Sequence, residues 1–169
     1  LEVEMSSKPR VLIYGASGYT GKLVAESLAQ RGVPFIFAGR NRERLEEGLK
    51  IVEQRFGEPV GSEIGVATNT VEELLPLLQD VDAVINVAGP FMQIAWPVVE
   101  AALQANCHYI DTTGEQDWTL AIKEKYGQAF ADKGLLLNPA NSYMWAAGAL
   151  AAEVVLETEG VDSLDIVYQ

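Results

Sequence analysis

Apolar and polar positions along the chain follow two alternating patterns. Short apolar runs bounded by glycine, proline or polar residues predict strands at 10–14, 33–38, 63–67, 83–87, 108–111 and 135–137. Between them, apolar residues recur three and four positions apart, most clearly at Leu45, Leu49, Val52 and Phe56, which is typical of amphipathic helices. Helices are expected at 20–31, around 45–56, and at 70–78, 94–105, 117–133 and 143–156. This alternation predicts a parallel sheet with helices on both faces.

Three glycines, Gly15, Gly18 and Gly21, stand three residues apart where the first strand meets the first helix. Gly15 allows a sharp turn, Gly18 allows a pyrophosphate to approach the backbone, and Gly21 allows the helix to lie close to the strand. A tight strand-to-helix turn without a ligand is the alternative. Because the motif opens an alternating chain, it favours a Rossmann-type three-layer α/β domain with a mostly parallel sheet of at least six strands.

The two ends of the chain differ from this central pattern. Residues 1–9 are expected to be disordered or expression-derived, and residues 10–160 form the predicted domain. The alanine-rich segment 143–156 is apolar on most faces, so we expect it to lie packed. Residues 163–169 alternate like a strand with no partner after it, which indicates a piece of a longer protein.

The composition narrows the classes of protein and the compartment. With 12 basic and 24 acidic residues, the net charge of −12 argues against a general nucleic-acid-binding protein. The apolar runs are too short to span a membrane. The single cysteine, Cys107, excludes an internal disulfide and favours a cytoplasmic setting. With one histidine and one cysteine, the spacing of a zinc site is absent, and no metal is expected.

The end of the second strand distinguishes the two nicotinamide cofactors. In this architecture it meets the adenosine ribose, where sites for NAD usually carry an acidic residue. Here Gly39, Arg40 and Asn41 follow the strand, and the first acid, Glu43, lies beyond the turn. Gly39 leaves room, and the Arg40 guanidinium offers a fork of donors to a 2′-phosphate. NADP is therefore expected, with NAD the less favoured alternative.

Arg42 and Arg44 continue the same basic run. Each has a second interpretation as a solvated residue of the first helical turn, paired with Glu46 or Glu47. That interpretation is preferred for Arg42. Arg44 is compatible with both and is kept among the candidate cofactor contacts.

Four motifs occur in a fixed order. They are Gly-Ala-Ser-Gly-Tyr-Thr-Gly at 15–21, Ala-Gly-Arg at 38–40, Val-Ala-Gly-Pro-Phe at 87–91 and His-Tyr-Ile-Asp-Thr-Thr-Gly-Glu at 108–115. With this set the chain resembles the saccharopine dehydrogenase-like oxidoreductases, which include saccharopine reductases and trans-acting enoyl reductases. The resemblance covers about residues 10–140. The first motif occurs in many dinucleotide-binding proteins, whereas the ordered set is more specific.

The resemblance implies an NADP-binding domain followed by a substrate or dimerisation domain, whose first strand would be 161–169. It implies a pyrophosphate on 15–21, the 2′-phosphate on Arg40, the nicotinamide-side ribose near 88–91, and a closing loop at 112–114. The expected cofactor contacts are Gly15, Ala16, Ser17, Gly18, Tyr19, Thr20, Gly21, Arg40, Asn41, Arg44, Ala88, Gly89, Pro90, Phe91, Thr112 and Gly114. Relatives often follow the sixth strand with a Gly-Phe-Asp-type segment, which residues 138–145 lack, so the substrate class stays open.

Other reactive side chains have structural interpretations beside their functional ones. His108, the only histidine, opens an apolar strand, so a structural role is preferred to acid–base catalysis. Cys107 has no basic neighbour in sequence and is expected to be a small buried apolar residue. Asp111 and Glu115 flank a loop on the cofactor side, where they either place a ribose or substrate or are solvated acids. No catalytic residue is assigned.

The predicted function is that of the cofactor-binding part of an NADP-dependent oxidoreductase. It would transfer hydride between NADPH and an unidentified small organic substrate, form a homodimer through the second domain, and be inactive as this chain alone. The alternative is a non-catalytic NADP(H)-sensing module that acts through a protein partner. A complete short-chain reductase is unsupported. Tyr143 is the tyrosine expected to face the cleft, and four residues on stands Ala147 in place of a lysine.

Overall fold

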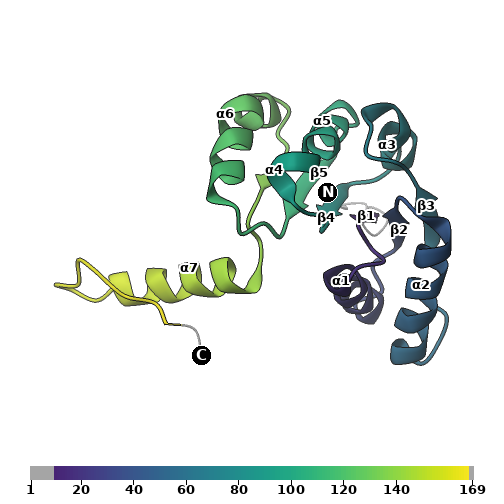
Figure 1. The fold of residues 1–169 in the computed structure, drawn as a ribbon. Helices are drawn as coiled ribbons and strands as arrows, with labels where there is room; N and C mark the ends of the chain where they lie inside the picture. Colours follow the sequence, from purple (N-terminus) through teal and green to yellow (C-terminus); the bar gives the residue numbers. More distant parts are fainter. Residues whose placement is uncertain (1–9, 168–169) are drawn as a thin grey trace, which may run out of the picture.

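The computed structural model describes residues 10–167 as a layered α/β domain (Figure 1). In chain order its elements are β1 (Val11–Tyr14), α1 (Tyr19–Gln30), β2 (Phe35–Gly39), α2 (Arg42–Phe56), β3 (Glu63–Val66), α3 (Val71–Leu78), β4 (Ala83–Asn86), α4 (Phe91–Ile94), α5 (Trp96–Gln104), β5 (His108–Asp111), α6 (Gln116–Asp132), β6 (Leu137–Asn138) and α7 (Tyr143–Leu156). The expected disordered or expression-derived start at 1–9 lies outside the described residues.

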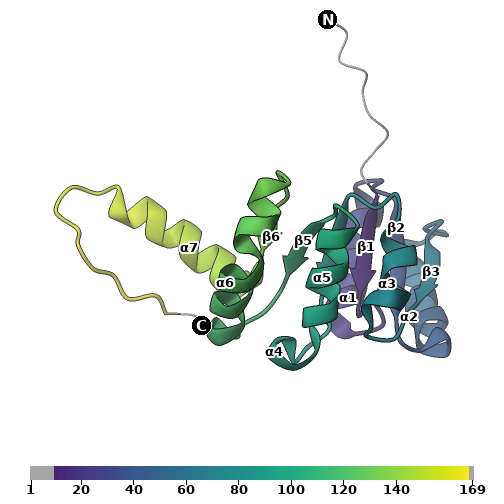
Figure 2. The ribbon, with the colours of Figure 1, turned by 90° about the horizontal axis from the view of Figure 1, so that it is seen from above.

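The six strands form one parallel sheet in the order β3-β2-β1-β4-β5-β6. Helices α1 and α2 cover one face, and α3, α5 and α6 cover the other (Figures 1 and 2). The strand order reverses between β1 and β4, and in such sheets ligands bind outside the carboxyl ends of the strands at this point. The predicted fold class is confirmed.

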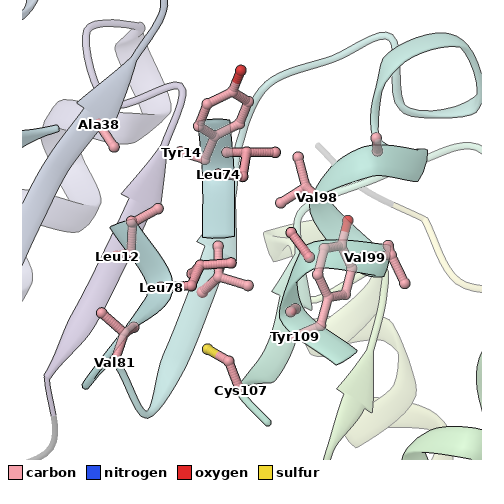
Figure 3. Close-up of a cluster of buried hydrophobic side chains, with 14 of the residues drawn as sticks. Leu12, Tyr14, Ala38, Leu74, Leu78, Val81, Val98, Val99, Cys107 and Tyr109 are labelled. Atoms are coloured by element: carbon pink, nitrogen blue, oxygen red, sulfur yellow. The ribbon is translucent and has the colours of Figure 1, made fainter. Parts of the chain in front are cut away.

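Successive residues of β1 face opposite layers of the domain. Leu12 and Tyr14 belong to a cluster with Leu74 of α3 and Tyr109 of β5, which Figure 3 shows. Ile13 faces the other way and packs beneath α1 and α2. Every β1 side chain is buried, which explains why the strand lacks polar alternation. Burial of a side chain such as Leu12 contributes about 1.5–3 kcal/mol to folding.

Most elements lie within two residues of their predicted bounds, and two departures have a clear physical reason. The helix expected at 94–105 is divided at Ala95 into α4 and α5, and Pro97 lies in the first turn of α5. Proline lacks the N–H that a continuous helix needs at this position. The strand expected at 135–137 lies instead at Leu137–Asn138. The N–H of Leu135 donates to the carbonyl of Phe130 and so still belongs to the end of α6.

Helix α7 has the predicted bounds, but the prediction that it lies packed is wrong for the described chain. It projects away from the sheet (Figures 1 and 2), and Leu150 and Val154 are 69% and 68% exposed. Only Gly148 of this helix is buried. The apolar residues surround the helix, and it is Trp145 of its first turn that shares a hollow with α6. Because α6 lies beside only the first turn of α7, most of the apolar surface of α7 stays exposed to solvent.

The sequence also predicts a strand over 161–169. In the part of this segment that the structure describes, 161–167, no strand is present, because an extended segment becomes a strand only by pairing with another. That residues 161–169 begin a second domain stays a prediction. Between residues 10 and 167, none of the helices has the length and apolarity that crossing a bilayer requires.

Cys107 is fully buried in the cluster of Figure 3, as expected for a small apolar residue. Burial raises the pKa of its thiol from 9.0 to about 12. Because only the thiolate reacts, we expect iodoacetamide at pH 8 to label the native chain roughly a thousandfold more slowly than the urea-unfolded chain. Mass spectrometry of timed samples measures both rates. Similar rates would contradict the burial of this thiol.

Candidate functional site

The turn after β1 has no room for a side chain at Gly15. This residue has a φ of +87°, and a Cβ on it would lie 2.9 Å from the backbone nitrogen of Ala88. The N–H groups of Gly15 and Ala16 both donate to the carbonyl of Ala38 at 3.0 Å. The turn is therefore held between the end of β2 and the segment after β4, which is the switch point of the sheet.

Helix α1 begins directly behind this turn, with Gly18 as its N-cap. A Cβ on Gly21 would lie 2.5 Å from the Cα and the carbonyl oxygen of Ala16, so the helix approaches the turn this closely only with glycine. The first helical hydrogen bond runs from Lys22 N–H to Gly18, and no side chain among the described residues caps the helix. The N–H groups of 19–21 therefore remain at the positive end of the helix, where anions bind.

The turn opens into a cleft of about 300 Å³ at the carboxyl ends of the central strands. The lining residues are Tyr14, Gly15, Ser17, Gly18, Gly39, Arg40, Asn41, Arg44, Asn69, Val87, Ala88, Gly89 and Ile94. The cleft thus brings together eight of the predicted contacts, namely Gly15, Ser17, Gly18, Arg40, Asn41, Arg44, Ala88 and Gly89.

The other predicted contacts lie outside this lining. Three are covered by the protein: Ala16, Gly21 and the ring of Phe91. Three are exposed: Tyr19, Thr20 and Pro90. The remaining two belong to the loop after β5, where Thr112 is half-buried and Gly114 lines a separate hollow between α6 and the first turn of α7. The covered residues shape the site without offering side chains to it.

The basic run after β2 divides between the cleft and the helix surface. Arg40 and Arg44 line the cleft. The Arg42 guanidinium lies 3.8 Å from the Glu46 carboxylate, which is the ion pair that its second interpretation predicts. Asn41 has a role that the sequence analysis missed, because its Oδ1 accepts a hydrogen bond from the Arg44 N–H at 2.9 Å and caps α2.

Tyr14 and Arg40 both line the cleft, and the charge of Arg40 affects the pKa of the Tyr14 hydroxyl. Burial raises the pKa of the Tyr14 hydroxyl, and the Arg40 guanidinium partly opposes that rise. The hydroxyl donates to the carbonyl of Ala67 at 3.4 Å. The Glu73 carboxylate acts on the same pKa in the opposite direction to Arg40, but it does not line the cleft, whereas Arg40 does and places a positive charge in it.

Asn69, which follows β3, is a cleft residue that the sequence analysis missed. Its Nδ2 donates to the carbonyl of Ile94, and this fixes the orientation of the amide because a carbonyl only accepts. Its Oδ1 is buried and has no hydrogen-bond partner among the described residues. An unpaired buried acceptor costs about 1–3 kcal/mol. Its place after the third strand was the sole sequence signal for this residue.

Asp111 is neither a solvated acid nor exposed to a substrate. Its side chain is fully buried and accepts four hydrogen bonds, from the N–H groups of Thr113 (3.0 Å) and Ala140 (2.9 Å), the Tyr109 hydroxyl (2.9 Å) and the Trp118 indole (2.7 Å). These donors compensate for the lost hydration of the carboxylate. Burial, together with the Asp111 charge, raises the pKa of Tyr109. Asp111 thus joins the loop after β5 to α6 and to the entrance of α7.

The half-buried Glu115 also binds backbone groups. Its two carboxylate oxygens accept the N–H groups of Phe91 at 2.7 Å and Met92 at 2.9 Å.

The side chain of His108 has the structural role that the sequence favours. Its Nδ1 accepts the N–H of Leu136 at 2.9 Å. Tyr143, the tyrosine expected to face the cleft, is 80% exposed and is not among the residues that line it. Among residues 10–167, no cluster of three or more His, Cys, Asp or Glu side chains is placed to hold a metal ion.

The sequence that forms this cleft matches a known protein family. The family described as saccharopine dehydrogenase NADP binding domain matches residues 11–131. The chain belongs to this family. The assignment confirms the resemblance found in the sequence, the oxidoreductase class of its relatives, and NADP as the cofactor.

Relatives of known sequence or structure agree with the family. The lipid droplet localized protein of Caenorhabditis elegans is 30% identical over 135 residues, which are 76% of this chain and 32% of that protein. The human saccharopine dehydrogenase-like oxidoreductase is 30% identical over 139 residues, 75% of this chain and 32% of that protein. Apo saccharopine dehydrogenase (L-Glu forming) of Saccharomyces cerevisiae shares the fold, with a TM-score of 0.71 and 17% identity over 88% of this chain and 31% of that one.

The relatives are longer than this chain and differ in location. The chain spans about a third, 32%, of the length of the curated relatives named above. Relatives are named for lipid droplets in one case and mitochondria in another, so the cytoplasmic location stays a prediction.

Proposed function

We propose that the cleft holds NADPH across the switch point, and that the chain is the cofactor domain of an oxidoreductase acting on a small organic substrate. The glycine turn carries this proposal. A side chain at Gly15 or Gly21 would collide with backbone, and the N–H groups at the start of α1 have no capping side chain among the described residues. A turn of this kind accommodates a diphosphate against the helix N-terminus.

The adenosine half is assigned to the end of the cleft beside β2 and β3. Arg40 would bind the 2′-phosphate, with Arg44 adding positive charge at the same end. The unpaired Oδ1 of Asn69 is an acceptor that suits a donor such as the exocyclic amine of adenine. None of the residues that line the cleft is Asp or Glu, and this favours NADP over NAD.

The nicotinamide half is assigned to the segment after β4. Ala88 and Gly89 line the cleft, and we assign Pro90, Phe91, Thr112 and Gly114 to the surroundings of the nicotinamide-side ribose. When bound, the cofactor supplies or accepts the hydride. The residues of this chain bind and orient it, and the buried ring of Phe91 closes the apolar layer behind this wall.

A second domain would supply the rest of the site. The titratable side chains that line the cleft are Tyr14, Arg40 and Arg44, so the cleft offers few groups that exchange a proton near neutral pH. We therefore place the proton donor and most of the substrate pocket in a domain that begins at 161–169. The exposed apolar surface of α7 supports this placement. A homodimer formed through that domain remains part of the proposal.

Titration of this chain with NADPH and NADH tests the assignment, with dihydronicotinamide fluorescence as the readout. We expect NADPH to bind at least tenfold more tightly, because hydrogen bonds to a charged phosphate contribute about 1.5–3 kcal/mol each. We also expect little or no turnover of enoyl or imine substrates by the chain alone. Failure of both cofactors to bind would refute the proposed function.

The non-catalytic sensing module makes a different prediction. It would bind NADP⁺ and NADPH with similar affinity, and a protein partner would respond to their ratio. The titratable groups of the cleft, limited to one tyrosine and two arginines, are compatible with this alternative. Hydride transfer by a longer protein that includes this domain would exclude it.

A further inference from the structure

Glu115 connects two loops that lie far apart in sequence at the nicotinamide end of the cleft. Its Oε1 accepts the N–H of Phe91 at 2.7 Å and its Oε2 accepts the N–H of Met92 at 2.9 Å. These are the first two N–H groups of α4, which no side chain of the preceding Pro90 is able to cap. Hydrogen bonds from N–H groups to a carboxylate are stronger than those between neutral groups.

The backbone of Glu115 is held by the loop that precedes it. The N–H of Glu115 donates to Thr113 Oγ1 at 2.9 Å, and the N–H of Thr113 donates to Asp111 Oδ1 at 3.0 Å. Asp111 is itself fully buried and bound by the Trp118 indole at 2.7 Å. Hydrogen bonds thus connect a buried carboxylate to the backbone of Glu115, and they fix the point from which its side chain extends to Phe91 and Met92.

A second branch of the same network reaches the cleft directly. The Tyr109 hydroxyl donates to Asp111 Oδ2 at 2.9 Å and accepts from Asn86 Nδ2 at 3.2 Å. Asn86 Oδ1 in turn accepts the N–H of Ala88 at 3.1 Å. Ala88 lines the cleft and lies against Gly15. The segment 88–92 is therefore held at its start through Asn86 and at its end through Glu115.

We infer that Glu115 is a positioning residue for the nicotinamide half of the cofactor. It touches no part of the cleft itself, since its carboxylate is engaged by Phe91 and Met92 and it does not line the cavity. It acts by fixing the backbone at Phe91 and Met92, directly after Ala88 and Gly89, the part of the cleft wall assigned to the nicotinamide riboside. This inference rests on the proposed function, because it presupposes that NADPH spans the cleft with its adenosine half at Arg40.

The substitution Glu115→Gln separates the two halves of the cofactor. Glutamine keeps one acceptor oxygen but places an NH₂ donor where the carboxylate accepts a backbone N–H, so one of the two hydrogen bonds is lost. We expect the Kd for NADPH to rise roughly tenfold. The Kd for adenosine 2′,5′-bisphosphate, which has no nicotinamide, should change less than twofold. The fluorescence of bound dihydronicotinamide should also shift, because its surroundings change.

Glu124→Gln is the matched control, since Glu124 is an exposed residue of α6 and the substitution changes the net charge equally. It should leave both dissociation constants unchanged. If Glu115→Gln does not fold, Thr113→Val removes the hydroxyl that holds the Glu115 N–H and keeps the carboxylate. That variant should show the same selective loss, reduced in size.

The outcomes are distinguishable. If the wild-type chain binds neither NADPH nor the bisphosphate, the proposed function fails. If it binds both, and Glu115→Gln weakens both equally or weakens neither, the positioning role of Glu115 is overturned while the proposed function stands. Selective loss of NADPH binding in Glu115→Gln and in Thr113→Val, with Glu124→Gln unaffected, supports the inference.

Discussion

Replacing Arg40 with alanine is expected to raise the Kd for NADPH roughly 10- to 100-fold and to leave the Kd for NADH within about twofold of its original value. Arg40 follows β2, lines the cleft, and brings a positive charge to the wall at Tyr14. Its planar guanidinium offers paired donors to a phosphate, and NADH carries no phosphate at that position. Fluorescence titration of both cofactors with both proteins measures the four constants.

Arg42→Ala provides the control, because Arg42 belongs to the same basic run but pairs with Glu46 and does not line the cleft. It removes one positive charge at nearly the same place in the sequence. We expect it to change NADPH affinity less than twofold. An equal loss in the two variants would mean that general charge, and not a specific contact of Arg40, determines affinity for the phosphate.

Replacing Gly21 with alanine is expected to lower the stability of the domain by about 3 kcal/mol, the upper end of the usual cost of overpacking. The added Cβ would lie 2.5 Å from the Cα and the carbonyl oxygen of Ala16, and backbone atoms cannot rotate out of the way. For a chain of this size, the loss corresponds to a decrease in Tm of roughly 6–12 °C. Thermal unfolding followed by circular dichroism measures it.

Gly127→Ala is the matched control in another helix. A Cβ on Gly127 would meet Lys123 Cγ at 3.7 Å, which is an ordinary contact. Glycine inside a helix is about 0.8–1 kcal/mol less favourable than alanine, so this variant should be slightly more stable than the original. A Gly21→Ala protein that unfolds at the original temperature would show that the helix does not approach the turn as closely as the geometry requires.

Local signals explain why much of the fold could be predicted from the sequence. The bounds of β5 and α7 match the prediction, and the other strands begin or end within two residues of the expected positions. The bounds of these elements are determined by residues that are close in sequence, such as the glycine turn at 15–21 or the apolar run of β1. The part of the cleft that is lined by Gly15, Gly18 and Arg40 follows from the same local motifs.

The parts that the sequence did not reveal depend on distant partners. From the sequence, Asp111 and Glu115 could be solvated loop residues, because the N–H groups that bind their carboxylates, those of Ala140 and Phe91, lie 29 and 24 residues away. The orientation of Asn69 depends on a hydrogen bond to Ile94, which lies 25 residues away. For α7, the composition indicates an apolar surface on most sides, but it does not specify what covers that surface.

The two arginines at one end of the cleft also influence how a cofactor arrives. The protein carries a net charge of −12, so at long range it repels a polyanion, while Arg40 and Arg44 attract it close to the cleft. Salt screens the long-range repulsion first, because the Debye length is about 10 Å at 0.1 M ionic strength. Moderate salt should therefore speed the encounter instead of slowing it, and we expect the 2′-phosphate end of the cofactor to be bound first.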